Sequence, residues 1–465
     1  MTSRRWGRFR SECFGQIRGG PTASAPTRKE TVLARCLVTG ATGYVGGRLT
    51  PLLVAAGHDV RVLARTPEKL SGVPWRDDVE VARGDLSDLD SLRSAFTGID
   101  VLYYLVHSMG TATDFADSER EAAANVAEVA KDAGVRRIVY LGGLHPDDAQ
   151  LSPHLASRTL VGETLMASGV ETVVLQAGVV VGSGSASFEM IRHLTDRLPV
   201  MTTPKWVHNR IQPIAVRDIL HYLVQSASVP FPTTRAWDVG GPDVLKYGDM
   251  MQVYAEEAGL RRRRMVVLPW LTPTIASWWV GLVTPIPSGL ARPLVESLHC
   301  DAICGEHDID AVIPPPEGGL TSYRDAVALA LACQSRPDTG AAWFNEPADS
   351  LPSDPDWSGA PAEVAEFRTP SRGADPTATL RNVAEAAWER QGWRVLPDDP
   401  SGPLTLTKDA RLGRAWLQFT AEGDGAVVHR SVLRPRGLLG QVYAATVWPL
   451  RRRMLHRRAD ALFSG

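Results

Sequence analysis

Short apolar runs alternate with longer segments of helical periodicity over the first two thirds of the chain. The helical segments carry apolar residues at three- and four-residue spacing and end at glycines, as at Gly57, Gly134 and Gly169. Alternation of short apolar strands with such helices is typical of a doubly wound α/β fold with a parallel sheet. The pattern predicts six strands, at residues 32–38, 58–65, 79–83, 100–106, 137–141 and 172–176.

The last third of the chain has a different pattern. Residues 336–375 are rich in Pro, Asp, Ser and Gly and predict a linker. Beyond it, the pattern predicts a helix from about residue 376 to Gly392, then two strands at 415–422 and 426–435 around a glycine-rich hairpin. A final helix is expected from about Leu438 to the arginines at 451–453. These elements indicate a separate α+β domain over 376–465.

Composition narrows the class of protein. The 465 residues have a formal net charge of -2 and a pI near 6.6, which gives no electrostatic case for nucleic acid binding. The five cysteines have no zinc-site spacing, so a reducing cytoplasm is the expected location. Residues 1–30 combine arginines with Gly, Ser and Pro and no apolar core. They predict a disordered extension or a start codon placed too far upstream.

One long uncharged segment raises the question of a membrane. Residues 265–291 carry no charge and include Trp270, Trp278 and Trp279. Prolines interrupt the segment repeatedly, which disfavours a membrane-spanning helix. An apolar pocket wall or a segment at the membrane interface is the better expectation.

The most specific motif follows the first predicted strand. Thr39 to Gly46 reads TGATGYVG and leads into a helical segment and then a second strand. In such a motif the first glycine, Gly40, allows a tight turn, Gly43 lets the backbone approach a pyrophosphate, and Gly46 lets the helix pack closely. The helix N-terminus supplies N–H groups to the anion. We therefore expect a dinucleotide here, held by Gly40, Thr42, Gly43, Tyr44, Val45 and Gly46.

The end of the second strand indicates which dinucleotide. An acidic residue there would hold the ribose 2′-OH of NAD, whereas Arg accommodates the 2′-phosphate of NADP. The chain has Arg65, which favours NADP(H), with NAD(H) as the alternative. Asp85 and Leu86 follow the third strand. Asp85 either accepts from the adenine amino group or caps the helix that begins near Asp88.

Ligands in such sheets lie beyond the carboxyl ends of the strands. Five polar residues follow or end strands at that edge and are expected to face a substrate: His107, Ser108, His145, Gln176 and Ser183.

Together these segments resemble an atypical, extended-type short-chain dehydrogenase/reductase of the NmrA-like and complex I accessory-subunit group, over about residues 32–336. The resemblance rests on the motifs above and on residues 103–110, 138–143 and 210–218. It implies an NAD(P)-binding Rossmann domain over 31–335 with a smaller substrate portion, assembled here from about 183–208 and 240–313.

The chemistry implied by the resemblance needs a Tyr with a Lys four residues later. None of the nine tyrosines has that Lys. Where the pair is expected the chain has His154 and Arg158, which keep the spacing, and a histidine can donate a proton. His154, Arg158 and His107 are therefore the candidate catalytic residues. The alternative is that His154 and Arg158 are surface residues at a helix end.

The last domain resembles the START-like helix-grip domain that follows such reductases in bacterial proteins, most clearly at residues 434–440. Its first half is expected to be shortened, with too few strands before residue 410. Arginines 451–453, 457 and 458 have two readings: a lipid-facing interfacial helix, or a solvated helix end that offsets the helix dipole.

Two functions follow from these features. One is an NAD(P)H-dependent oxidoreductase of an apolar or quinone-like small molecule. The other is a non-catalytic NADPH-binding redox sensor, or an accessory subunit of a respiratory or biosynthetic complex. A nucleotide-sugar epimerase is a more distant alternative, because it relies on the absent pair. We expect a cytoplasmic protein, with contact at the inner membrane face as an alternative. Substrate identity and oligomeric state stay open.

Overall fold

The computed structural model describes most of the chain, in two compact units. The first unit is built mainly from residues between 33 and 333, and the second mainly from residues between 363 and 464. The described residues are 33–106, 115–146, 151–268, 284, 286, 288–335, 363–370, 388, 392–395, 404–421, 426–435 and 437–464.

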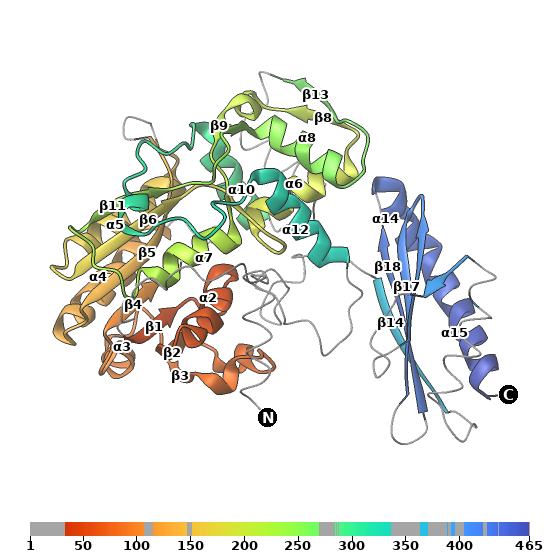
Figure 1. Cartoon of the computed structure of the whole chain (residues 1–465), viewed down its shortest axis with the longest axis horizontal. Helices are drawn as coiled ribbons and strands as arrows, with labels where there is room; N and C mark the ends of the chain where they lie inside the picture. The colour runs from red at the N-terminus through yellow and green to blue at the C-terminus, as the bar shows by residue number, and fades with distance from the viewer. Residues whose placement is uncertain are drawn as a thin grey trace, which may run out of the picture. The chain divides into compact units, whose positions relative to one another are not determined.

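The first unit is organised around a seven-stranded parallel sheet (Figure 1). All six predicted strands form, and a seventh, β11, joins them. The strand order β11-β6-β5-β4-β1-β2-β3 is that of a doubly wound Rossmann-like fold. The seventh strand, β11, is a half-buried strand at the sheet edge that the apolar pattern did not predict. The strands are β1 Arg35–Thr39, β2 Asp59–Ala64, β3 Glu80–Arg83, β4 Val101–Tyr104, β5 Arg137–Gly143, β6 Glu171–Ala177 and β11 Arg235–Val239.

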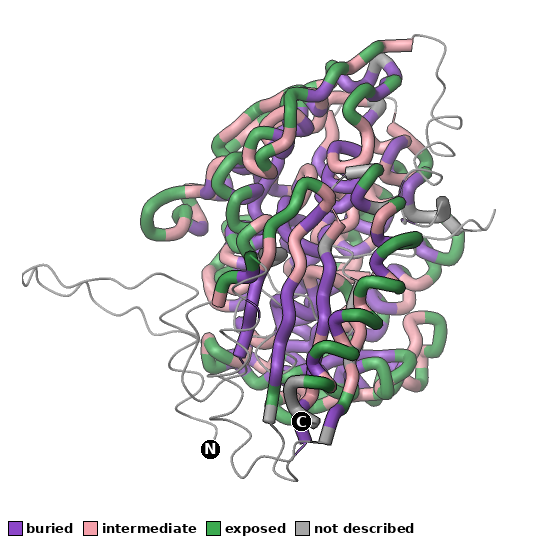
Figure 2. Tube along the Cα trace, turned by 90° about the vertical axis from the view of Figure 1, so that its right-hand side faces the viewer, coloured by how far each residue is buried: buried purple, intermediate pink, exposed green. Residues whose placement is uncertain are grey.

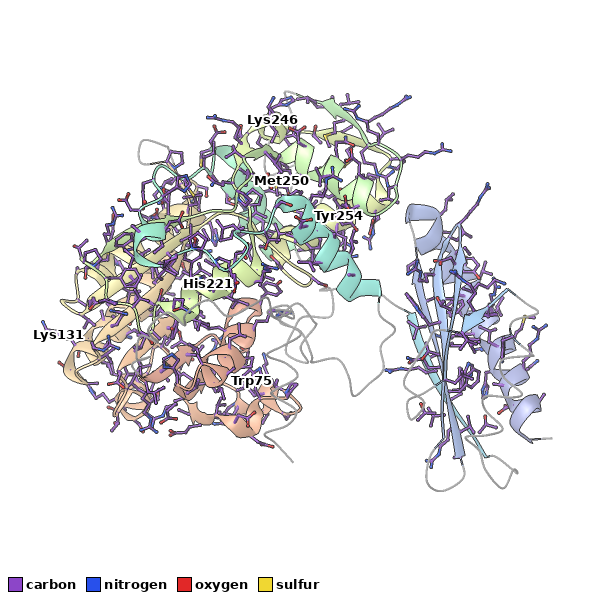
Figure 3. All side chains as sticks on the ribbon, in the orientation of Figure 1. Trp75, Lys131, His221, Lys246, Met250 and Tyr254 are labelled. Carbon is purple, nitrogen blue, oxygen red and sulfur yellow. The ribbon has the colours of Figure 1, made fainter. Side chains whose placement is uncertain are left out.

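Helices cover both faces of this sheet, which is why its strands read as continuous apolar runs. Alternate residues of β1 show the two layers: Cys36 and Val38 pack with helices α2 (Tyr44–Ala55) and α7 (Val216–Gln225). Leu37 packs on the other face. That second layer consists of α3 (Leu89–Phe96), α4 (Phe115–Asp132) and α5 (Pro153–Met166). Short helices η1 (Pro67–Leu70) and η2 (Arg76–Asp78) flank Trp75, which is buried beside β2 and β3 (Figure 3).

A smaller portion is assembled from segments that follow β6. It contains three two-stranded sheets and is held together by buried aromatic pairs such as Phe188 with Tyr254 and Trp206 with Tyr247. Met250 and Tyr254 lie on α8 of this portion (Figure 3). Its elements are β7 Val180–Val181, α6 Ala186–Arg197, β8 Val200–Thr203, η3 Lys205–His208, β9 Arg210–Ile211, β10 Ile214–Ala215, β12 Leu245–Lys246, α8 Tyr247–Glu257, β13 Arg264–Val267, α10 Ser288–Glu296, η4 Ser297–His299, α11 Ile309–Val312 and α12 Tyr323–Ser335.

The uncharged segment at 265–291 lies largely outside the described residues, and so do Trp270, Trp278 and Trp279. Within the part of the chain that the structure describes, no helix is both long enough and apolar enough to cross a bilayer.

The second unit contains a five-stranded antiparallel sheet of order β14-β18-β17-β16-β15. Helices α14 and α15 are described with it, and Trp388 also has helical backbone. The C-terminal helix α15 packs against β14 and β18. In Figure 2 the strands of this unit are largely buried, whereas the helix carries exposed residues on its outward side. The elements are β14 Glu363–Pro370, β15 Arg394–Val395, β16 Leu404–Ala410, β17 Gly413–Ala421, β18 Ala426–Pro435, α14 Gly437–Thr446 and α15 Trp448–Ser464.

Two expectations for the last third of the chain are corrected. Strand β14 lies inside the predicted 336–375 linker, because the Pro and Ser content around it hides its short alternation. Among the described residues, strands β14, β15 and β16 begin before residue 410, and the expected shortening of this half stays a prediction. The single final helix is two helices that meet at Val447, since Pro449 fits the first turn of a helix but not its interior. Arg451 to Arg453 therefore lie near the start of α15, so the helix-end reading is wrong. The helix expected from 376 lies outside the described residues except at Trp388 and Gly392.

Candidate cofactor and active site

The glycine motif forms the turn between β1 and α2. Gly40 has φ +77°, a left-handed conformation that favours glycine. A Cβ atom on Gly40 would lie 2.6 Å from the carbonyl oxygen of Leu105, just beyond β4. Both the backbone conformation and the space at this position therefore require glycine, and the turn is pressed against the carboxyl end of the neighbouring strand.

Gly43 and Gly46 have separate roles in the same turn. Gly43 is the N-cap residue of α2, is exposed, and donates its N–H to the Gly40 carbonyl at 2.9 Å. No side chain caps this helix, and its first turn has no acidic residue. A Cβ on Gly46 would lie 2.3 Å from the Gly40 oxygen, so Gly46 packs the helix on its own turn. An exposed helix start without a side-chain cap or acidic residue suits a pyrophosphate.

Thr39 is a residue of this turn whose role the motif did not reveal. Its hydroxyl donates to the Tyr103 carbonyl at 3.0 Å and accepts from the Leu105 N–H at 3.3 Å. The side chain thus joins the carboxyl ends of β1 and β4, where the glycine turn begins. In the sequence, a hydroxyl-bearing residue directly before the first glycine could have indicated this role.

The first turn of α2 meets the second glycine loop. The Arg48 guanidinium lies 4.0 Å from the centre of the Tyr44 ring and donates to the Tyr44 carbonyl at 3.0 Å. A Cβ on Gly182 would lie 2.3 Å from the Tyr44 hydroxyl oxygen. The loop at residues 182–185 is therefore in contact with the cofactor turn, although the two are far apart in sequence. Thr42 and Val45, also predicted to contact the cofactor, are half-buried within the turn.

Arg65 and Asp85 lie at the carboxyl ends of β2 and β3, where the nucleotide end of the cofactor is expected. Arg65 is exposed. The Asp85 carboxylate accepts from the Ser87 N–H at 3.0 Å and from its hydroxyl at 2.8 Å. The backbone hydrogen bond is the largest cause that lowers the pKa of Asp85, and the positive charge of Arg65 adds to it.

The alternative role of Asp85 as a helix cap is wrong. The Asp88 side chain caps α3, by accepting from the Asp90 N–H. The Asp85 carboxylate thus stays in its turn beside Arg65. The Leu86 carbonyl accepts from the Asn125 side chain at 3.1 Å, which fixes the loop to α4.

Two glycines form the end of β5, so no hydroxyl side chain is present there. Gly142 and Gly143 belong to the strand itself. A Cβ on Gly143 would lie 2.9 Å from the end of the Leu155 side chain on α5, so a larger residue there would require that side chain to move. The glycines thus permit close packing of α5 on the sheet and supply no hydroxyl.

His154 and Arg158 are not surface residues of a helix end, so that alternative is wrong. His154 is 8% exposed, and burial, with a contribution from the Arg158 charge, lowers its pKa to about 4. Arg158 is half-buried and donates to the Leu141 carbonyl at 2.7 Å, while the Tyr140 hydroxyl donates to the Arg158 carbonyl at 3.1 Å. His154 is consequently neutral at pH 7. His107, the third catalytic candidate, and Ser108 lie outside the described residues.

The other polar residues at this edge are organised by local contacts. The His145 ring lies 3.0 Å from the Thr159 hydroxyl and 3.3 Å from the Pro146 carbonyl. Gln176 is half-buried in β6, and Ser183 is buried in the second glycine loop. Among the described histidines, His145 therefore lies just beyond the carboxyl end of β5. Thr159 of α5 orients its ring.

A buried charged group fixes the second glycine loop. Glu189 accepts from the Gly184 N–H at 2.9 Å and pairs with Arg192, and the Arg192 guanidinium contacts the His193 ring at 2.9 Å. All three side chains are at most 2% exposed. The sequence did not indicate that Glu189, Arg192 and His193 are buried, because charged residues on an amphipathic helix usually face solvent.

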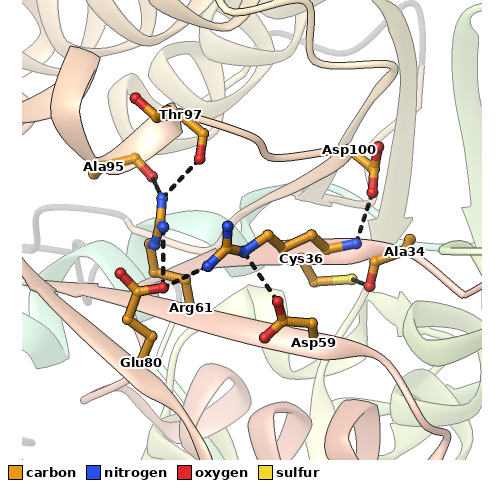
Figure 4. Close-up of polar contacts among 9 residues, drawn as sticks. Ala34, Cys36, Asp59, Arg61, Glu80, Ala95, Thr97 and Asp100 are labelled. Atoms are coloured by element: carbon orange, nitrogen blue, oxygen red, sulfur yellow. Dashed lines mark hydrogen bonds and ion pairs between the residues drawn. The ribbon is translucent and has the colours of Figure 1, made fainter.

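Charges also gather at the opposite end of the sheet, where β1 to β3 begin (Figure 4). Arg35 pairs with Asp59 at 3.0 Å and with Glu80 at 2.7 Å. Arg61 pairs with Glu80 at 2.9 Å and donates to the carbonyls of Ala95 and Thr97. These groups satisfy one another, and the arrangement is structural.

Comparison with known proteins agrees with this geometry. Residues 40–181 match a family model described as NAD(P)H-binding. The 3 beta-hydroxysteroid dehydrogenase/Delta 5-->4-isomerase of Mycobacterium tuberculosis is 34% identical over 120 residues, which are 24% of this chain and 32% of that protein. The chain thus spans about a third of the length of that relative. The ceramide reductase of Caulobacter vibrioides is 28% identical over 272 residues, 57% of this chain and 84% of that protein.

A solved structure supports the fold. The NADPH-dependent quinone oxidoreductase of Escherichia coli, crystallised with NADPH, superposes with a TM-score of 0.51 at 19% identity, over 63% of this chain and 98% of that protein. The first unit therefore contains an NAD(P)H-binding domain of Rossmann-like fold.

Proposed function

We propose that this protein is an NADP(H)-dependent oxidoreductase that acts on an apolar or quinone-like small molecule. The observation that carries the proposal is the turn at Gly40 to Gly46, in which glycine is required at two positions and the exposed helix start has no side-chain cap. The match of residues 40–181 to an NAD(P)H-binding family supports it.

The residues at the carboxyl ends of the strands fit the parts of the cofactor in order. The turn from Gly40 to Gly46 would hold the pyrophosphate, and Arg65 would pair with the 2′-phosphate. Asp85 and Leu86 lie on the adenine side. When bound, the nicotinamide would supply or accept a hydride.

The chain itself must supply a proton if the substrate is a carbonyl. Burial keeps His154 neutral, which makes it a weak proton donor at pH 7. His145 lies just beyond the carboxyl end of β5, and its ring is held 3.0 Å from the Thr159 hydroxyl. We therefore propose His145 ahead of His154 as the donor, with His107 as the further candidate, and Arg158 as the residue that positions the end of β5.

The substrate class is inferred from two sources. The similar proteins named above are a steroid dehydrogenase, a ceramide reductase and a quinone oxidoreductase, and each of those names denotes a largely apolar substrate. The sequence adds an uncharged, Trp-containing segment at 265–291, placed where a substrate portion is expected. Together these features support the proposal of an apolar ligand.

A two-step experiment tests the proposal. Calorimetric titration of the full chain with NADPH and NADH should show binding, tighter for NADPH. Absorbance at the reduced-nicotinamide band should then fall when a panel of quinones and apolar aldehydes or ketones is added. The His145→Gln variant should retain NADPH binding and lose most of that turnover. Turnover that is unaffected in this variant would exclude His145 as donor.

A second candidate is a non-catalytic NADPH sensor or an accessory subunit. The absence of a Tyr with Lys four residues on, together with the neutral, buried His154, favours it. Such a protein would be stabilised by NADPH through mass action, yet no acceptor of the panel would oxidise the bound cofactor. NADPH binding without oxidation of the cofactor by any acceptor would therefore favour the non-catalytic function.

The second unit fits a START-like helix-grip domain in its elements, an antiparallel sheet with a long C-terminal helix on β14 and β18. We propose that assignment, and a cytoplasmic location, on the resemblance of residues 434–440 and on the cysteine spacing.

A further inference from the structure

The two C-terminal helices expose a group of large apolar side chains. On α14 these are Leu439 and Val442, which are 72% and 52% exposed. On α15 Leu450 is 62% and Met454 59% exposed, and Val447 between the helices is 47% exposed. Single exposed apolar residues need no explanation, but five gathered on one pair of adjacent helices indicate an interaction surface.

The geometry of α15 separates this surface from the side that packs on the sheet. With about 100° per residue, Trp448, Leu455 and Ala459 lie within about 40° of one another, and all three are buried. Leu450 and Met454 lie about 40° apart on the opposite side of the helix. The exposed side chains are therefore not the edge of the core. They form a second apolar stripe that the described residues leave uncovered.

Arginines border the second stripe on both sides. Arg453 and Arg457 follow one border, and Arg451 and Arg458 follow the other. All four are exposed. The Arg451 guanidinium donates to the Tyr443 hydroxyl at 2.9 Å, which links α15 to α14. We call these four arginines and the five apolar residues Leu439, Val442, Val447, Leu450 and Met454 the C-terminal face.

The charge of this segment is opposite in sign to that of the chain. Residues 437–464 contain five arginines and one aspartate, a formal charge of 5 − 1 = +4, whereas the whole chain has a charge of -2. Asp460 does not lie on the face, because its carboxylate accepts from the Thr369 hydroxyl on β14. The face therefore presents positive charge together with apolar side chains.

We propose that the C-terminal face binds the surface of an anionic lipid membrane. The apolar stripe would enter the boundary between headgroups and acyl chains, and the arginines on its two borders would reach the phosphates. A helix that lies flat on a membrane needs an apolar surface on one side only. No helix among the described residues can cross a bilayer. The charge selects the partner, because two copies of a +4 surface would repel each other in a symmetric dimer.

Vesicle co-sedimentation of the full chain tests the proposal. We expect binding to vesicles that contain phosphatidylglycerol in phosphatidylcholine, little binding to phosphatidylcholine alone, and weaker binding at high salt. The variant R453E/R457E should reduce the bound fraction at least tenfold, and L450E/M454E should do the same at low salt. The matched controls are R411E, an exposed arginine in the β16–β17 turn, and V244E, an exposed apolar residue of the first unit. Both controls should bind as the unmodified chain does.

Three results would overturn the proposal. Equal binding to vesicles with and without anionic lipid would exclude the charge-selective mechanism. Binding that neither double variant reduces would assign the interaction to another part of the chain. A dimer by light scattering that L450E/M454E converts to a monomer, with no vesicle binding in either, would identify the face as an interface between two copies. Circular dichroism of each variant confirms that the second unit remains folded.

Discussion

The two ends of the seven-stranded sheet differ in how they use charge. At the amino ends, Arg35, Arg61, Asp59 and Glu80 pair with one another, and Arg61 also satisfies two backbone carbonyls. At the carboxyl ends, the β1–α2 connection is a glycine turn, and the exposed Arg65 directly follows β2.

This difference separates stability from binding within one sheet. Groups that already satisfy one another have little to offer a ligand, and removing the buried Arg61 leaves two backbone carbonyls without their donor. A helix start without a side-chain cap and an exposed arginine contribute little to the fold, but they are available to an anion. Substitutions at the two ends should consequently affect different measurements.

The largest effect is expected at the amino end. Arg61→Ala should lower the free energy of unfolding of the first unit by roughly 3 kcal/mol, because the Ala95 and Thr97 carbonyls lose their buried donor. Glu80 would keep its pair with Arg35. Urea denaturation followed by circular dichroism measures this loss. The matched control is Arg93→Ala, an exposed arginine on α3, which should cost less than about 1 kcal/mol. An equal cost for the two variants would contradict the contrast between the ends.

At the carboxyl end, Gly43→Val should weaken NADPH binding by about 100-fold or more while the fold survives. The added side chain would stand where the backbone must approach the pyrophosphate, and among the described residues its Cβ would closely approach only the Gly40 oxygen, at 3.2 Å. Calorimetry measures the affinity. Gly305→Val, whose Cβ would lie 3.6 Å from the Asp238 carboxylate, should bind NADPH normally. Normal binding by Gly43→Val would remove the site.

Arg65→Asp should produce a smaller and selective effect. Loss of one charge-assisted contact to the 2′-phosphate should weaken NADPH binding by about tenfold, and NADH binding should change little. The preference between the cofactors should narrow or invert. Arg120→Asp on α4 serves as the charge control. If the unmodified chain binds NADPH and NADH equally, Arg65 has no role in cofactor choice.

The smallest effect concerns His154, where burial and the nearby Arg158 charge disfavour the protonated ring. Its pKa is lowered from 6.5 to about 4 in the folded chain, so the unfolded chain binds the proton more tightly. The stability from this histidine is present above pH 6.5 and is lost as pH falls toward 4, on the order of 1 kcal/mol by pH 6. His154→Gln should flatten that part of the stability profile, and His208→Gln, at an exposed site, should not. Identical pH profiles for all three proteins would show that His154 titrates normally.

The sequence was most informative where one local segment determines the structure. The six strands and the turn at Gly40, Gly43 and Gly46 were predicted, because apolar runs and glycine spacing encode them directly. The burial of His154 could not be read in this way, since it depends on how α5 packs against α4, where Ser157 meets Glu119. The break between α14 and α15 was available in the sequence, at Pro449, but a continuous helical periodicity concealed it.

Strand β11 and strand β14 were missed for a related reason. Arg235–Val239 alternates too weakly to be recognised, because an edge strand is only partly buried. Glu363–Pro370 ends in a proline and lies within a polar region, and its identity as a strand comes from its pairing with β18. Long-range pairing of this kind leaves no local pattern.

That pairing also sets an order of events during synthesis. Of the described strands of the second unit, β14 is the first to leave the ribosome, yet its partner β18 is the last, with Glu363 opposite Leu433. The hairpins β16–β17 and β17–β18 can close from neighbouring residues, whereas β14 must wait until β18 has emerged. The first unit, complete in sequence by then, can fold earlier. A ribosome stalled before residue 426 would therefore carry a folded cofactor domain followed by a strand that still lacks its partner.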